Sequence, residues 1–123
     1  MLTAAFLILA IAVLIGTVLA ILHARGETAQ AIPWTLGALH GLIGIGGLGL
    51  LLLALRGPPR GLDQGTASFG MIGAVLIALA ALVGLAIFRA FRMKRGHRAG
   101  TLIGIHATVA VSGFVILAAY VFA

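Results

Sequence analysis

The sequence has few of the side chains that catalysis usually requires. It contains no cysteine, and only two of its 123 residues, Glu27 and Asp63, are acidic. The missing thiols exclude disulfides, thiolate metal sites and iron–sulfur clusters held by this chain. Glu27 and Asp63 fall in segments expected on opposite sides of a membrane, which excludes chemistry by a pair of carboxylates. We also find no Ser–His–Asp or Cys–His arrangement.

Charge is scarce as well. Charged residues make up 8% of the chain and hydrophobic residues 63%, and the mean hydropathy is +1.27. A soluble domain carries about 25% charged residues, so the composition indicates an integral membrane protein whose main contact is the lipid bilayer. The net charge of +6 comes from short segments beside apolar runs. Lipid headgroups and topology account for such segments, so we do not expect nucleic acid as a partner.

Four apolar segments are long enough to cross a bilayer, which takes about 20 helical residues. We predict transmembrane helices at about 2–22, 33–55, 67–88 and 101–122. The connectors between them are short, so neighbouring helices should run antiparallel. The expected fold is an all-α integral membrane four-helix bundle that forms one transmembrane domain over residues 1–123.

The basic residues predict an orientation. Six of the eight Lys and Arg residues lie after the first and third predicted helices. Positive charge marks the cytoplasmic side, so both termini should lie outside the cytoplasm. The expected membrane is a bacterial inner membrane. Trp34 and Tyr120 should lie near opposite membrane interfaces.

Two segments of the sequence resemble each other. Residues 35–47 read TLGALHGLIGIGG and residues 101–113 read TLIGIHATVAVSG, with Thr, Leu, His and the final Gly at matching places 66 residues apart. LAI at 19–21 and 85–87 has the same offset, whereas LIG at 14–16 and LVG at 82–84 are 68 apart. We interpret the pattern as a tandem duplication of a two-helix hairpin, with halves at about 1–60 and 67–123.

The duplication gives two intramembrane histidines equivalent positions. His40 follows Pro33 by seven residues, about 10 Å along a helix, and His106 follows Thr101 by five, about 7 Å. Both should therefore lie at similar depth toward the cytoplasmic side, facing each other across the bundle. Ionisable residues inside a membrane are uncommon and usually functional.

This histidine pair suggests a haem site. Haem b with two axial imidazoles needs them on opposite faces of its flat macrocycle, so His40 and His106 are the candidate ligands of the haem iron. Small residues near them would let the macrocycle approach the backbone: Gly37, Gly44, Gly47, Ala110 and Gly113. Three arginines at the cytoplasmic end are candidates to pair with the haem propionates: Arg25, Arg95 and Arg98.

Other interpretations of the same residues stay open. The small residues also suit close helix packing, with the histidines forming only hydrogen bonds between helices. Another metal or a quinone is a further possible ligand of the pair. We interpret His23 and His97, at helix ends, as surface histidines, with a minor alternative that His23 approaches a quinone or a second ligand site.

The four-helix layout with its histidine pair resembles the small four-helix membrane b-type cytochromes. The resemblance implies electron exchange with a quinone or a partner redox complex, and an electron-transfer subunit rather than a stand-alone enzyme. That family often holds two haems, whereas the predicted outward half of this chain has no histidine, so one haem is expected. The alternative is an accessory subunit of a respiratory or photosynthetic complex, with structural, lipid-binding or pigment-binding histidines. A transporter ranks third, and either a larger complex or a homo-oligomer is the expected assembly.

Overall fold

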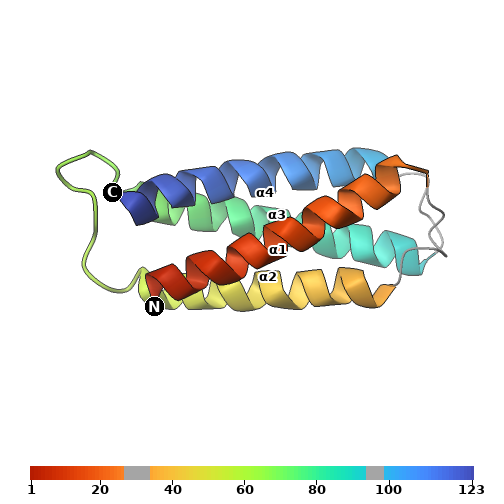
Figure 1. Ribbon diagram of the computed structural model, residues 1–123, viewed down its shortest axis with the longest axis horizontal. Coiled ribbons are helices and arrows are strands. Elements are labelled where there is room, and N and C mark those ends of the chain that lie inside the picture. The colour runs from red at the N-terminus through yellow and green to blue at the C-terminus, as the bar shows by residue number, and fades with distance from the viewer. Residues whose placement is uncertain (27–33, 94–98) are drawn as a thin grey trace.

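The computed structural model describes residues 1–26, 34–93 and 99–123, and these form four helices (Figure 1). They are α1 (Leu2–Ala24), α2 (Trp34–Ala54), α3 (Phe69–Arg92) and α4 (Ala99–Phe122). All four are long and apolar enough to span a membrane. The all-α class and the four predicted helices are therefore confirmed.

The largest difference from the predicted boundaries is at the end of α3. We expected a loop from residue 89, but the helix continues to Arg92. Arg89 and Arg92 thus lie in its last turn, where positive side chains interact favourably with the carbonyl end of the helix dipole. The basic side chains of α3 therefore lie at its end, away from the middle of the span.

The four helices form two hairpins. α1 packs most extensively on α2, and α3 on α4, while contacts between the hairpins (α2 with α3, α1 with α4) are fewer. Figure 1 shows α1 in front, with α2 and α4 at the bottom and top of the bundle. α2 and α4 are therefore diagonal neighbours, and side chains from both can meet at the centre.

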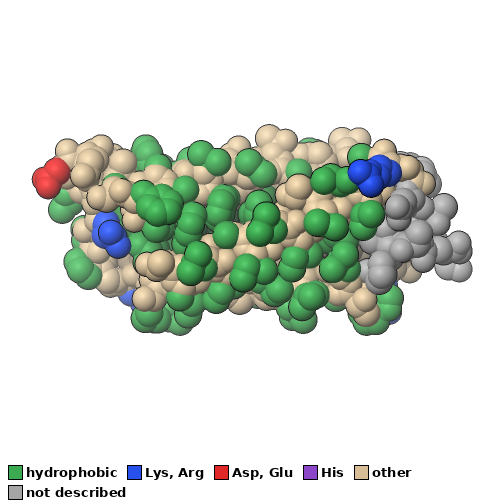
Figure 2. Space-filling model, in the orientation of Figure 1, with side chains coloured by type: hydrophobic (Ala, Val, Ile, Leu, Met, Phe, Trp, Pro, Cys, Tyr) green, Lys and Arg blue, Asp and Glu red, His purple; other side chains and the backbone are tan. Residues whose placement is uncertain are grey.

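The outer surface of the bundle is apolar. Figure 2 shows hydrophobic side chains along the whole length of the visible face, with charged side chains only toward the two ends. Many large side chains on all four helices are exposed, such as Leu14, Leu42, Leu82 and Val115. This distribution suits contact with lipid along the sides and with water at the ends.

Packing is concentrated in one half of the bundle. This packed half lies toward both termini and the connector between α2 and α3 (Figure 1). Its core consists of Ala5, Leu9, Leu51, Ala74, Leu117, Tyr120 and Val121. Phe6 of α1 stacks on Phe114 of α4 with ring centroids 4.9 Å apart, which ties the two hairpins together there.

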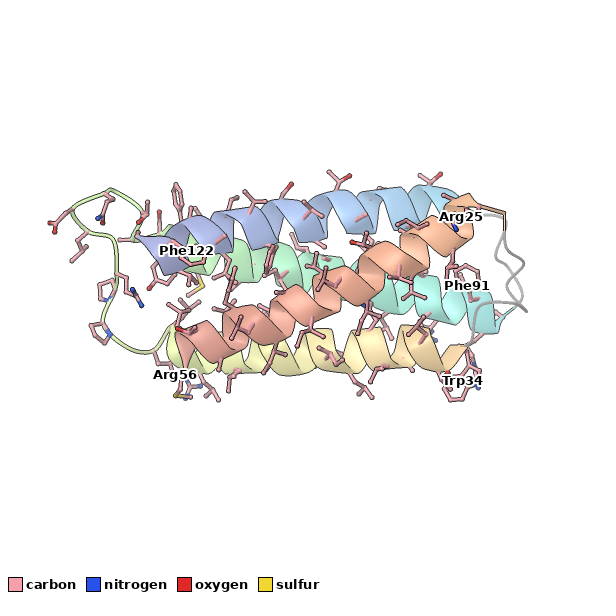
Figure 3. All side chains as sticks on the ribbon, in the orientation of Figure 1. Arg25, Trp34, Arg56, Phe91 and Phe122 are labelled. Atoms are coloured by element: carbon pink, nitrogen blue, oxygen red, sulfur yellow. The ribbon has the colours of Figure 1, made fainter. Side chains whose placement is uncertain are left out.

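The opposite half ends in Arg25, Arg89 and Arg92, and we call it the basic half. Arg25, Trp34 and Phe91 are labelled at this end in Figure 3. Among the described residues of this half, Ala99 alone is fully buried. The same fold thus has a close-packed half and a loosely packed half.

The two predicted interfacial aromatics differ in environment. Trp34 is 61% exposed at the basic end, and the Arg92 guanidinium lies 5.6 Å from its ring centroid. Tyr120 lies toward the opposite end but is only 4% exposed, within the core of the packed half. Gly70 leaves the space for its ring, because a Cβ there would lie 2.8 Å from Tyr120 Cε1. Tyr120 therefore packs inside the bundle and does not form part of an aromatic belt.

Candidate functional site

The imidazoles of His40 and His106 face each other inside the bundle. His40 comes from α2 and His106 from α4. Their ring centroids are 5.9 Å apart and their planes cross at 77°. The structure thus brings together two side chains that are 66 residues apart in the sequence.

Each imidazole is held by a backbone carbonyl of its own hairpin. His40 Nδ1 lies 2.9 Å from the carbonyl oxygen of Ala12 in α1, and His106 Nδ1 lies 2.7 Å from that of Ala80 in α3. A carbonyl oxygen can only accept a hydrogen bond, so Nδ1 carries the proton in both rings. In the neutral imidazole, Nε2 then keeps its lone pair for another partner.

A glycine lies beneath each ring, one helical turn after the accepting carbonyl. A Cβ on Gly16 would lie 2.8 Å from His40 Cε1, and a Cβ on Gly84 would lie 3.0 Å from His106 Cε1. Both rings therefore lie against a neighbouring helix at a position without a side chain. We call Ala12, Gly16, His40, Ala80, Gly84 and His106 the histidine layer.

Matching contacts continue beyond the histidine layer. A Cβ on Gly47 would meet Leu9 at 2.9 Å and Ile8 at 3.1 Å, and one on Gly113 would meet Leu76 at 2.9 Å and Ile77 at 3.1 Å. Gly47 and Gly113 each follow a layer histidine by seven residues. Leu51 and Leu117, four residues further on, are both completely buried. The contacts of Gly47 and Gly113 therefore lie at matching positions of the two hairpins.

The remaining predicted site residues lie in varied surroundings. Gly37 and Gly44 have open space where a Cβ would be, whereas Gly47 and Gly113 pack against the partner helix of their own hairpin. Ala110 is half-buried on α4. Arg25 is exposed at the basic end (Figure 3). Arg95 and Arg98 lie outside the described residues.

The two other histidines are not part of the layer. His23 is half-buried at the end of α1, where its ring meets the Phe91 ring edge-on at 6.2 Å. Its Nε2 would lie 3.9 Å from a Cβ on Gly100, at the start of α4. His97 lies outside the described residues.

Sequence reasoning identified the two histidines but missed the residues that hold them. Ala12 and Ala80 are 68 residues apart, as are Gly16 and Gly84. This is the offset already visible between LIG at 14–16 and LVG at 82–84. The repeated spacing of an alanine four residues before a glycine could therefore have pointed to these positions. Nothing in the sequence showed that a histidine would contact the alanine carbonyl.

The number of protein ligands restricts the metal chemistry. Within residues 1–26, 34–93 and 99–123, no group of three or more His, Cys, Asp or Glu side chains gathers. A protein zinc site uses three or four protein ligands, whereas haem iron receives four nitrogens from the macrocycle and needs two axial ligands at most. Within the described residues, the layer thus offers a metal two imidazole ligands, fewer than such a zinc site uses.

Three comparisons, with protein-family models, with curated proteins and with solved structures, gave no match to this chain.

Proposed function

We propose that this protein is a membrane electron-transfer module that binds one haem b between His40 and His106. The observation that carries the proposal is the facing pair of imidazoles, each bound through Nδ1 to a backbone carbonyl. Metal-ligating histidines commonly donate their second ring N–H in this way, because the bond fixes the tautomer and the ring orientation. Both rings already have that arrangement.

The spacing of the rings agrees with the proposal. An iron held by both imidazoles through bonds of about 2 Å would place the ring centres about 6 Å apart, because each centre lies roughly 1 Å behind its nitrogen. The observed separation is 5.9 Å. The diagonal placement of α2 and α4 gives the two ligands opposite directions of approach.

The surroundings suit the two ends of a haem. The packed half offers apolar contacts, whereas the basic half ends in Arg25, Arg89 and Arg92. Guanidinium groups form strong bidentate hydrogen bonds with carboxylates, so these arginines, with Arg95 and Arg98, are candidates to hold the propionates. When bound, haem supplies reversible one-electron transfer at its iron. A quinone or a redox complex is the proposed electron partner, reached from the basic side.

Topology and origin complete the proposal. The basic half faces the cytoplasm of a bacterial cell and both termini lie outside it, because positive charge is retained on the cytoplasmic side. The matching contacts of the two hairpins support an origin by tandem duplication. A reporter fused to the C-terminus should therefore be active outside the cytoplasm, and a cytoplasmic signal would reverse this orientation.

A second function has support from the same bonds. In an accessory subunit of a membrane complex, the histidines would only join helices, and the contacts from His40 to Ala12 and from His106 to Ala80 already do so. The tightly packed Gly47 and Gly113 also suit a purely structural role. In that case the apolar outer surface would contact larger subunits.

The deciding experiment is a reduced-minus-oxidised absorption spectrum of the purified protein, with a pyridine haemochrome assay. We expect a b-type α-band with one haem per chain. His40→Ala and His106→Ala should each abolish six-coordinate haem, whereas the controls His23→Ala and His97→Ala should retain it. A blank spectrum from protein made with sufficient haem would reject the cytochrome and favour the accessory subunit.

A further inference from the structure

The two glycines of the histidine layer have a specific relation to the carbonyls that hold the rings. In an α-helix, the N–H of residue i+4 bonds the carbonyl of residue i, so Gly16 and Gly84 are the helical partners of Ala12 and Ala80. A side chain at i+4 stands close to that carbonyl, since side chains tilt toward the helix N-terminus. Glycine at i+4 therefore exposes the carbonyl to a second donor.

The imidazoles occupy this exposed space. The Cβ position of Gly16 is 2.8 Å from Cε1 and 3.3 Å from Nδ1 of His40, and the corresponding distances from Gly84 to His106 are 3.0 and 3.2 Å. A methyl group would press on the ring atoms at and beside the hydrogen-bonded nitrogen. The ring would have to move off the carbonyl or rotate about its own bonds.

We propose that Gly16 and Gly84 are positioning residues that fix the tautomer and the crossed orientation of the His40 and His106 rings. Each glycine acts through the imidazole that lies against it. The effect on haem rests on the function proposed above. The effect on the tautomer concerns the protein alone and does not require haem.

If haem binds as proposed, the crossed rings would give its iron a characteristic spectroscopic property. The angle between two axial imidazole planes determines the splitting of the iron d orbitals in low-spin ferric haem. Parallel planes give a rhombic electron paramagnetic resonance spectrum, whereas crossed planes give a strongly axial spectrum dominated by one low-field feature. For a haem held by both rings at the 77° crossing, the axial form would be expected, and a ring that rotates when its glycine is replaced would shift the spectrum toward the rhombic form.

The test uses Gly16→Ala and Gly84→Ala, with Gly46→Ala as the matched control. Gly46 also lies in a helix, but its Cβ position faces open space. In haem-free protein labelled with 15N-histidine, nuclear magnetic resonance should show Nδ1 protonation for both layer histidines, assigned by comparison with His40→Ala and His106→Ala. Gly16→Ala should remove that signature from His40 alone, and Gly84→Ala from His106 alone. An unchanged tautomer in both variants would overturn the proposal.

Two further measurements distinguish the possible failures. In haem-loaded protein, either substitution should shift the electron paramagnetic resonance spectrum, whereas Gly46→Ala should not. If the wild type binds no haem, the proposed function fails, but the tautomer measurement still tests the role of the glycines. If Gly16→Ala folds poorly, Gly16→Ala combined with His40→Ala should recover the stability of His40→Ala, because the clashing ring is gone. A double variant no more stable than Gly16→Ala would reject the contact with the ring as the cause.

Discussion

The packed half and the basic half use the same four helices in different ways. In the packed half, leucines and aromatic rings from the hairpins fill the centre, with Leu51 and Leu117 fully buried and Phe6 stacked on Phe114. Toward the basic end the contacts are polar: the histidine layer joins helices within the bundle, and Arg92 lies over the exposed Trp34 ring at its surface. The stability of the bundle should therefore come mainly from the packed half.

The difference follows from what lipid can and cannot supply. Inside a membrane, apolar side chains gain little by leaving lipid, so helix association depends on close packing and on hydrogen bonds between helices. The packed half is held by close packing, and the histidine layer by hydrogen bonds between helices. Loss of a packed side chain should consequently have a larger effect on stability than loss of a contact at the basic end.

The largest effect is expected from Leu51→Ala and Leu117→Ala. Each removes a fully buried side chain and leaves a cavity, which destabilises a close-packed core by about 2–5 kcal/mol. Leu102→Ala, at a half-buried position in the basic half, should cost under about 1 kcal/mol. Unfolding by titration with a denaturing detergent in mixed micelles gives the free energies. Equal losses at Leu51 and Leu102 would contradict the contrast between the halves.

An intermediate effect is expected from Gly47→Val. The new side chain would overlap Leu9, whose nearest atoms are already 2.9 Å from the Cβ position, and such overpacking costs about 1–3 kcal/mol. Gly49→Val places the same side chain at an exposed position with no atom within 4 Å, so it should change stability by less than about 0.5 kcal/mol. The same titration measures both variants, and indistinguishable results would show that the α1–α2 contact is not close-packed.

The smallest effect is expected from Arg92→Ala. A cation–π contact at an exposed site contributes about 0.5–1 kcal/mol, so unfolding should change by no more than that. Trp34 is the sole tryptophan, and its fluorescence spectrum should shift when the guanidinium over its ring is removed. Arg56→Ala, at the opposite end (Figure 3), should leave the spectrum unchanged. A shift in both variants would point to a general effect of charge.

The sequence was sufficient to predict the helices and the facing histidines, for a simple physical reason. Long apolar runs between polar connectors leave few alternatives in a membrane, and matching positions in two similar segments lie at matching depths. The extension of α3 to Arg92 was missed because the basic residues resembled a loop. Tyr120 lies toward one end of the bundle, but the sequence does not show that Gly70 leaves room for its ring in the core.

The contacts inside the candidate site were beyond sequence reasoning. Gly47 and Gly113 were predicted to border a cofactor because they lie seven residues from a histidine, but the structure packs them against their hairpin partners. Helical periodicity tells which residues share a face, and it does not tell which neighbouring helix covers that face. For the same reason, the carbonyls of Ala12 and Ala80 could not be identified, since any backbone carbonyl is a potential acceptor.

The pairing of each histidine with its own hairpin has a consequence for biosynthesis. His40 bonds to α1 and His106 to α3, so neither ring depends on the other hairpin for its hydrogen bond. When the first hairpin enters the bilayer during translation, its imidazole can already be satisfied before the second has been made. An unpaired polar group is costly in lipid, and the hydrogen bond to the preceding helix removes this cost at insertion. The two hairpins can then associate afterwards.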